Sequence, residues 1–163
     1  RTIVVNGFSK TYAMTGWRLG YLRAPRWLAR RIIAFQSHTT SNPTTFAQYG
    51  AIAALEGKAD KEVRHMCEEF AKRRDLVYEL ISAIPGVKCI RPQGAFYLLC
   101  DVSSFGMTSE EFCNRLLAEE KLAAIPCCSF GAEGQIRLSY ACSEENIRDA
   151  AGRLDAFCRE HGN

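Results

Sequence analysis

The chain has 163 residues, of which 47% are hydrophobic and 24% charged, and its net charge is +3. This composition is sufficient for a hydrophobic core, no apolar run approaches the length of a membrane span, and no signal peptide is visible. The basic residues are spread out, and the tightest group, residues 72–74, lies between acidic side chains, which indicates a solvated helix face. We therefore expect neither a nucleic acid nor a membrane as a partner.

The cysteine pattern argues against both a disulfide framework and a zinc site. No C-x-x-C pair occurs, and the three histidines are scattered along the chain. Most cysteines fall in segments with apolar periodicity, where cysteine acts as a small hydrophobic residue. We expect a reducing, cytoplasmic setting. The eight cysteines are at positions 67, 89, 100, 113, 127, 128, 142 and 158.

The first third of the chain predicts two strands and a helix. Residues 2–6 are rich in β-branched side chains, and their apolar character predicts burial on both faces, as in a parallel sheet. Residues 7–14 would form a loop at the carboxyl end of that strand, where open α/β sheets place ligand sites. Residues 17–22 predict a second strand, and a proline then opens a helix over 25–37. Its apolar side chains at helical spacing are Trp27, Leu28, Ile32 and Phe35.

Two further helices are predicted after a polar turn at residues 37–42. The first covers residues 43–55 and ends at Gly57, with a face of small residues suited to close packing. The second is a long amphipathic helix over 58–84, which Pro85-Gly86 ends. The small face consists of Ala47, Ala51 and Ala54, and the apolar stripe of the long helix of Val63, Met66, Phe70, Val77, Leu80 and Ile84.

The second half alternates short strands and helices, which indicates an α/β or α+β layer. Thr108 and Glu111 form a capping box, so a helix begins there, with Phe112, Leu116 and Leu117 on its buried side. Ser143 caps a final helix with a stripe of Ile147, Ala151, Leu154 and Cys158. The predicted strands cover residues 87–91, 95–102, 122–126 and 135–141, with turns at 92–94 and 131–134.

Lys10 and Arg18 are the first candidates for chemistry, because they share a loop that is flanked by glycine and serine. A lysine amine can form a Schiff base with a carbonyl cofactor, and an arginine can hold a phosphate through two parallel hydrogen bonds. A phosphate-binding P-loop is rejected. That motif needs glycine at the positions that Ser9 and Val4 occupy.

The run of residues 7–20, GFSKTYAMTGWRLG, resembles the cofactor-lysine motif of class I and II aminotransferases, the fold-type I pyridoxal-phosphate enzymes, and most closely that of prokaryotic aspartate aminotransferases. Later motifs agree in order and spacing. The resemblance covers essentially the whole chain but only the carboxyl-terminal part of a family member, in keeping with a sequence that opens directly into a strand. The later motifs are at residues 41–43, 92–97, 130–131 and 136–141.

The resemblance implies an α/β fold in three parts. Residues 1–57 would be the remnant of the large pyridoxal-phosphate-binding domain, and residues 58–85 a long linking helix. Residues 86–163 would be the small carboxyl-terminal domain. A family member acts on an amino acid and a 2-oxo acid, aspartate-like here, and we expect a homodimer.

Four residues receive roles from the resemblance. Lys10 would bind pyridoxal 5′-phosphate and move a proton on the substrate, while Ser9 and Arg18 would bind the cofactor phosphate. Arg137 would bind the substrate α-carboxylate. The pattern itself supports Arg137, since alternation along the strand places it opposite Ile136, Leu138 and Tyr140.

Two positions depart from the family pattern. Gly7 stands where many members have a phosphate-binding serine, and Cys127 stands where glycine is common, on a loop that borders the substrate. The family's aspartate at the pyridine nitrogen precedes the lysine, so we expect this chain alone to be inactive. The alternatives are a lyase or ligand-responsive regulator of the same fold, and a non-catalytic folding or dimerisation module.

Overall fold

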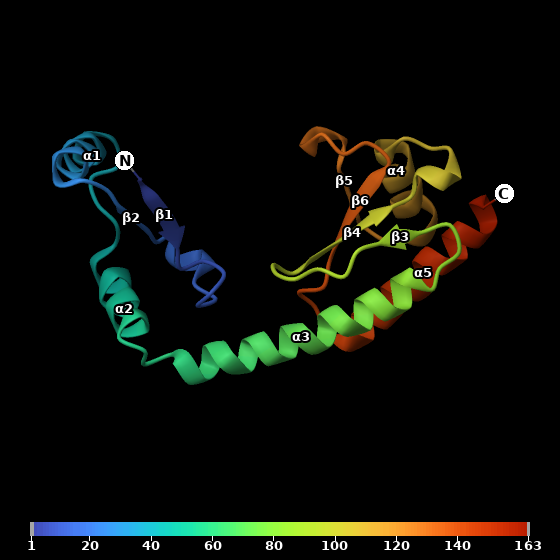
Figure 1. The fold of residues 1–163 in the computed structure, drawn as a ribbon, viewed down its shortest axis with the longest axis horizontal. Helices are drawn as coiled ribbons and strands as arrows, with labels where there is room; N and C mark the ends of the chain where they lie inside the picture. The colour runs from blue at the N-terminus through green and yellow to red at the C-terminus, as the bar shows by residue number, and fades with distance from the viewer. Residues whose placement is uncertain (1, 163) are drawn as a thin grey trace. The chain divides into compact units, whose positions relative to one another are not determined.

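The computed structural model describes residues 2–162 and forms two compact units that divide between Met66 and Cys67. Figure 1 shows the order of the elements along the chain. None of the helices within these residues is both long and apolar enough to cross a bilayer.

The first unit opens with a β-hairpin. Strand β1 (Val4–Gly7) pairs antiparallel with β2 (Gly20–Arg23), with Gly7 opposite Gly20. The prediction of a parallel strand buried on both faces was wrong: Val5 is 76% exposed. The intervening loop returns the chain to the side of β1, and no third strand pairs with this hairpin among residues 2–162, where Ile3, Val4 and Val5 are all exposed.

The helices of the first unit match their predicted places with shifts at the ends. Helix α1 (Arg26–Thr39) continues past the start of the predicted turn at 37–42. Its predicted apolar stripe is not buried, since Trp27 and Phe35 are both exposed. Helix α2 (Thr45–Leu55) agrees with the prediction for 43–55, and Gly57 follows it at φ +81°, a conformation that glycine adopts readily.

A small core holds the loop between β1 and β2 against α2. Phe8 and Leu19, at the two ends of that loop, are buried with Ala47 and Ala51 of α2. The predicted small-residue face, which also includes Ala54, is therefore confirmed as buried. Small side chains on the helix allow the loop backbone to approach closely, which positions the segment that carries Lys10.

Helix α3 (Asp60–Ser82) carries the chain from the first unit into the second. Its second half is buried through Val77 and Ile81, and Ile84 follows in the same core, while Val63 and Met66 are only half-buried. The predicted stripe is thus confirmed for the part that packs in the second unit. Gly86 has φ +84° and turns the chain after Pro85, as the sequence predicts.

The second unit contains a four-stranded antiparallel sheet in the order β3-β4-β6-β5. All four predicted strands exist, but each is shorter than predicted. Ala95 has φ +60°, which is outside the β region, so β4 cannot begin as early as predicted. The strands are β3 (Lys88–Cys89), β4 (Tyr97–Asp101), β5 (Ile125–Pro126) and β6 (Gln135–Ser139).

Two capped helices complete the second unit. Helix α4 (Ser109–Glu120) begins at Thr108, whose side chain accepts a hydrogen bond from the Glu111 N–H at 3.1 Å. Helix α5 (Glu144–His161) begins at Ser143, which accepts from the Asn146 N–H at 3.2 Å. Both caps are confirmed, because each satisfies a backbone donor that the first turn leaves unpaired.

One hydrophobic core joins α3, α4, α5 and the inner face of the sheet. The rings of Phe105 in η2 (Ser103–Phe105), Phe112 and Phe157 lie edge to face in succession, with centroids 5.6 and 5.0 Å apart. Leu117 is 51% exposed, which corrects the prediction that it faces the core. The predicted α5 stripe is confirmed as buried: Ile147, Ala151, Leu154 and Cys158.

We expect Leu154→Ala to destabilise the second unit by about 2–5 kcal/mol, because Leu154 is fully buried and its loss leaves a cavity. Urea unfolding should be followed by far-UV circular dichroism, since both tryptophans, Trp17 and Trp27, lie in the first unit. Leu117→Ala on α4 is the matched control, and it should cost about 0.5 kcal/mol or less. Equal losses in the two variants would contradict the core described above.

Candidate functional site

The loop between β1 and β2 is closed at its base by the buried pair Phe8 and Leu19. The Phe8 N–H donates to the Leu19 carbonyl at 3.4 Å, and the Phe8 ring contacts that of Tyr12 at 5.7 Å between centroids. Within the loop the Ala13 N–H donates to the Lys10 carbonyl at 3.3 Å, while the Lys10 side chain lies on the exposed side. The backbone around Lys10 is therefore held by the loop itself.

Thr15 connects two of the predicted site residues. Its hydroxyl donates to the Ser9 carbonyl at 2.9 Å, and its own carbonyl accepts from Nη1 of Arg18 at 2.8 Å. Ser9 and Arg18 are thus brought together on either side of one residue. Thr15 was not among the site residues predicted from the sequence. The tendency of threonine to bond nearby backbone groups was the one available signal, and it is common to many loops.

The backbone turns sharply at Arg18, which follows η1 (Thr15–Trp17). Arg18 has φ 54° and ψ 47°, a left-handed conformation that costs a non-glycine residue about 1–2 kcal/mol. The predicted strand at 17–22 therefore begins only at Gly20. Strain of this kind is tolerated where the surrounding structure fixes it, and here the hydrogen bond to Thr15 and the burial of Leu19 do so.

The chemistry of this loop suits a phosphate-bearing aldehyde. It offers an amine on Lys10, a hydroxyl on Ser9 and a guanidinium on Arg18. Residues 1–55 contain seven Lys or Arg side chains and no Asp or Glu, so no carboxylate in this stretch competes with an anionic ligand. The donor set therefore fits pyridoxal phosphate.

Arg137 lies in the second unit, on the outer face of β6. Ile136, Leu138 and Tyr140 are buried on the inner face, which confirms the predicted alternation. The guanidinium carbon of Arg137 lies 4.3 Å from the ring centroid of Tyr97 and 5.2 Å from that of Phe130 in η3 (Cys128–Phe130).

A cavity of about 910 Å³ opens around Arg137 and lies wholly within the second unit. It combines apolar walls with cationic groups, a pairing that suits an amphipathic carboxylate. Among residues 2–162 no ion pair joins Arg137 to a carboxylate, whereas several other arginines of this unit have one. Residues that line the cavity include Arg91, Tyr97, Leu99, Asp101, Phe130 and Arg137.

The backbone at Cys127 does not require the glycine that is common at this position in the family. Its φ of −95° and ψ of 5° are accessible to any L-residue, and its N–H donates to the Gln135 carbonyl at 2.9 Å. Burial raises the pKa of the Cys127 thiol, while the charge of Arg137 opposes that shift. Buried thiols that stay protonated are poor nucleophiles, so Cys127 acts as a packing residue.

The eight cysteines all lie within the described residues and are free thiols. Burial raises the pKa of Cys113 to about 11 and that of Cys158 to about 12, and it also raises that of Cys100. These side chains therefore remain neutral in the core at ordinary pH. This behaviour agrees with the interpretation of cysteine as a small hydrophobic residue in this chain.

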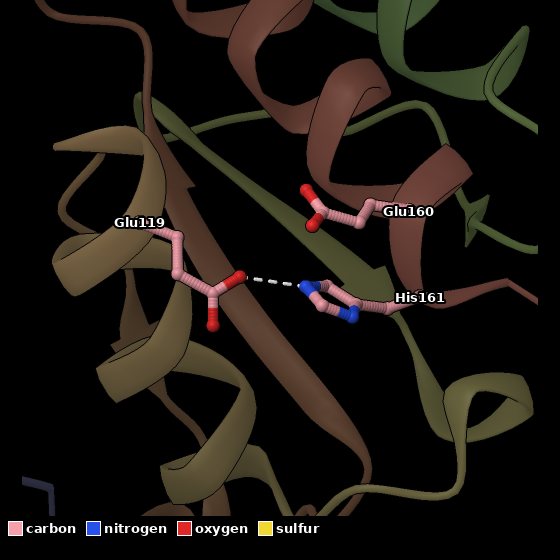
Figure 2. Close-up of side chains that lie close together, drawn as sticks. All are labelled: Glu119, Glu160 and His161. Carbon is pink, nitrogen blue, oxygen red and sulfur yellow. Dashed lines mark hydrogen bonds and ion pairs between the residues drawn. The ribbon is translucent and has the colours of Figure 1, made fainter.

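A cluster that sequence spacing did not reveal lies between α4 and α5. Glu119, Glu160 and His161 bring possible metal-ligand atoms within 4.8 Å of one another, and Figure 2 shows the Glu119–His161 pair. The guanidinium of Arg115 already lies 2.9 Å from Oε1 of Glu119 and 3.2 Å from the His161 ring nitrogens. The positive charge of Arg115 would repel a metal ion at this place. We therefore interpret the cluster as a set of electrostatic contacts that joins the two helices.

Asp75 on α3 fixes Arg91 at the edge of the cavity. Its carboxylate accepts from Nε of Arg74 at 2.8 Å and from Nη2 of Arg91 at 2.6 Å. The hydrogen bond from Arg74, and then that from Arg91, lowers the pKa of Asp75 to about 2. Arg91 therefore has a carboxylate partner from its own unit.

Comparison with known proteins gives a consistent result. The family model described as Aminotransferase class I and II matches residues 1–154. The aspartate aminotransferase of Pyrococcus abyssi is 42% identical to this chain, over 98% of the chain and 42% of that protein. The chain therefore spans less than half of the length of this relative.

Solved structures show the same relationship. The aromatic aminotransferase of Pyrococcus horikoshii superposes with a TM-score of 0.93 at 40% identity, over 98% of this chain and 43% of that one. Aspartate aminotransferase from Thermus thermophilus with maleate gives a TM-score of 0.90 at 39% identity, over 95% of this chain and 41% of that one.

The low pKa of Asp75 predicts how the stability of the second unit depends on pH. Because its folded-state pKa lies below the ordinary value of 3.8, its stabilising contribution is present above about pH 4 and is lost as the pH falls toward 2. Carboxyl-carbon NMR should give an Asp75 midpoint near 2, and Asp75→Asn should abolish this part of the acid destabilisation. Arg91→Gln is the control that should raise the midpoint. A wild-type midpoint near 3.8 would contradict the ion-pair geometry.

Proposed function

Because the chain belongs to the class I and II aminotransferase family, we propose that the protein which contains it is a pyridoxal 5′-phosphate-dependent aminotransferase. It would move an amino group between an amino acid and a 2-oxo acid. The observation that carries this proposal is the loop in which Thr15 joins Ser9 to Arg18 beside Lys10. The proposed activity is that of a polypeptide as long as its relatives, and the Pyrococcus abyssi relative is more than twice as long as this chain.

Four residues of this chain would bind the cofactor and the substrate. Bound pyridoxal phosphate supplies an electron sink that makes the α-proton of an amino acid acidic. Lys10 would bind the cofactor covalently through its amine. Once the substrate amine has displaced it from the cofactor, the freed Lys10 amine would carry a proton to and from the substrate α-carbon. Arg18 would hold the phosphate through charge-assisted hydrogen bonds, with a further bond from Ser9. Arg137 would bind the substrate α-carboxylate.

An aspartate-like amino acid is the favoured substrate. The Pyrococcus abyssi relative is named an aspartate aminotransferase, and the Thermus thermophilus enzyme was solved with maleate, a dicarboxylate. The aromatic aminotransferase of Pyrococcus horikoshii is similar to the same degree, so aromatic amino acids are the competing substrates. Product analysis with both donors, with elimination products measured alongside, separates these two substrates and the lyase alternative.

The remaining proposals concern organisation and setting. We propose that residues 1–57 belong to the large cofactor domain, 58–85 to a linking helix and 86–163 to the small domain, in a cytoplasmic homodimer. Free thiols at all eight cysteines support a reducing setting. Exposed apolar side chains such as Val5 and Phe35 support burial against further protein. The same exposure favours self-association of the chain alone, which would make it a dimerisation module.

Lys10 can be tested by chemical trapping. The complete polypeptide, loaded with pyridoxal phosphate and reduced with borohydride, should carry the cofactor mass on the peptide that contains Lys10. Lys10→Ala should lose both this label and the visible absorption of the bound cofactor. Lys58→Ala is the matched control, since Lys58 is exposed and pairs with Glu56 at 2.8 Å. If Lys10→Ala still carries the label, on another lysine and to the same extent as the wild type, the assignment is refuted.

The 163-residue chain should show no steady turnover by itself. Family members place an aspartate against the cofactor ring nitrogen, and the first acidic residue of this chain is Glu56. Without a carboxylate at that nitrogen the ring withdraws electrons poorly. The assay measures formation of the new amino acid from an amino donor and a 2-oxo acid, with the complete polypeptide as the control. Sustained product formation by the chain alone would overturn this expectation.

A further inference from the structure

The way in which Arg137 is held differs from that of other arginines in the second unit. Arg91, Arg115 and Arg153 each form an ion pair with a carboxylate of the same unit, at 2.6–2.9 Å. Arg137 instead lies over two aromatic rings, those of Tyr97 and Phe130.

We propose that Tyr97 and Phe130 are positioning residues, which orient the Arg137 guanidinium for the substrate carboxylate without occupying its hydrogen-bond donors. This inference rests on the proposed function, in which Arg137 binds that carboxylate. Neither ring needs to touch the substrate.

The shape of the guanidinium group allows an aromatic ring to hold it without blocking its donors. It is planar, its N–H donors point outward in the plane, and its faces stack on aromatic rings. A carboxylate binds in the same plane through two parallel hydrogen bonds. Contact with a ring face therefore restrains the group while its N–H edge stays available. A carboxylate partner from the protein would restrain it equally well but would compete with the substrate.

The one acidic side chain among the lining residues of this cavity is already engaged. Asp101 lines the cavity with Arg137, but its Oδ1 accepts from the Ser103 N–H at 2.9 Å and from the Ser103 hydroxyl at 2.6 Å. These hydrogen bonds lower the pKa of Asp101 and hold its carboxylate toward the backbone of residue 103. Asp101 is therefore occupied locally, and the described contacts of Arg137 remain aromatic.

Tyr97 is the better supported of the two rings. Leu99 of β4 pairs with Arg137 of β6, which places Tyr97 one position away diagonally on the same face of the sheet. The Tyr97 ring is half-buried and packs against Phe96 with centroids 4.6 Å apart. Phe130 is 64% exposed and lies farther from the guanidinium. We expect Tyr97 to contribute more than Phe130.

The expected size of the effect follows from the freedom of the Arg137 side chain that the ring removes before the carboxylate binds. Without the ring, the Arg137 side chain must be ordered when the carboxylate binds, and this cost corresponds to roughly a threefold to tenfold change in affinity. Loss of the Tyr97 ring should weaken carboxylate binding by about that factor. The maximal rate should change less than twofold, because orientation of the carboxylate acts mainly on binding.

The test uses the complete holoenzyme and two measurements. Calorimetry gives the Kd of maleate, a dicarboxylate that binds without reacting, and steady-state kinetics gives KM and kcat for the amino donor. Tyr97→Leu should raise Kd and KM by about threefold to tenfold with kcat nearly unchanged. Tyr97→Phe keeps the ring and should behave as the wild type. Phe130→Leu should give a smaller rise, and its exposed position keeps it testable if Tyr97→Leu does not fold.

Arg137→Met separates this inference from the proposed function. If Arg137→Met loses maleate affinity but Tyr97→Leu and Phe130→Leu do not, the positioning role is wrong and the carboxylate role of Arg137 stands. If Arg137→Met binds maleate as the wild type does, the carboxylate role is wrong and the positioning role falls with it. An equal loss in Tyr97→Phe and Tyr97→Leu would assign the effect to the hydroxyl group and overturn the ring contact.

Discussion

The antiparallel pairing of β4 with β6 decides what the second unit can do. Register fixes which side chains face the helices, because alternate residues of a strand point to opposite faces. Ile136 and Leu138 enter the core, so Arg137 must face outward with Tyr97 and Leu99. A slip of one residue would bury a charge and expose the core. Stability of the sheet and presentation of the arginine therefore depend on the same register.

The loop of the first unit obeys a different constraint. The pairing of Gly7 with Gly20 and the burial of Phe8 and Leu19 fix its two ends, and backbone hydrogen bonds hold the segment between them. The left-handed conformation of Arg18 shows that local preference yields to this closure. Lys10 remains exposed on a loop whose ends are fixed, an arrangement that combines a precise position with access for a ligand.

Sequence reasoning succeeded where a physical rule acts locally. The caps at Thr108 and Ser143 were predicted because a side chain three residues away satisfies the first turn. It failed at β1, where apolar residues predicted burial on both faces but Val4 and Val5 are exposed in the described chain. It also missed Thr15 and the pairing of Arg137 with aromatic rings, because contacts of this kind depend on where separate segments meet. The roles of Lys10, Ser9, Arg18 and Arg137 came from resemblance and stay proposals.

The uneven distribution of charge has a kinetic consequence. Seven cationic side chains and no anionic ones precede Glu56, so the segment that carries Lys10 generates a positive potential around itself. A dianionic phosphate ester would be drawn toward this segment from beyond contact distance. Salt screens such a field over roughly 8–10 Å at physiological ionic strength. Capture of such an ester by this segment would consequently slow as ionic strength rises, even when the hydrogen bonds of the bound state are unchanged.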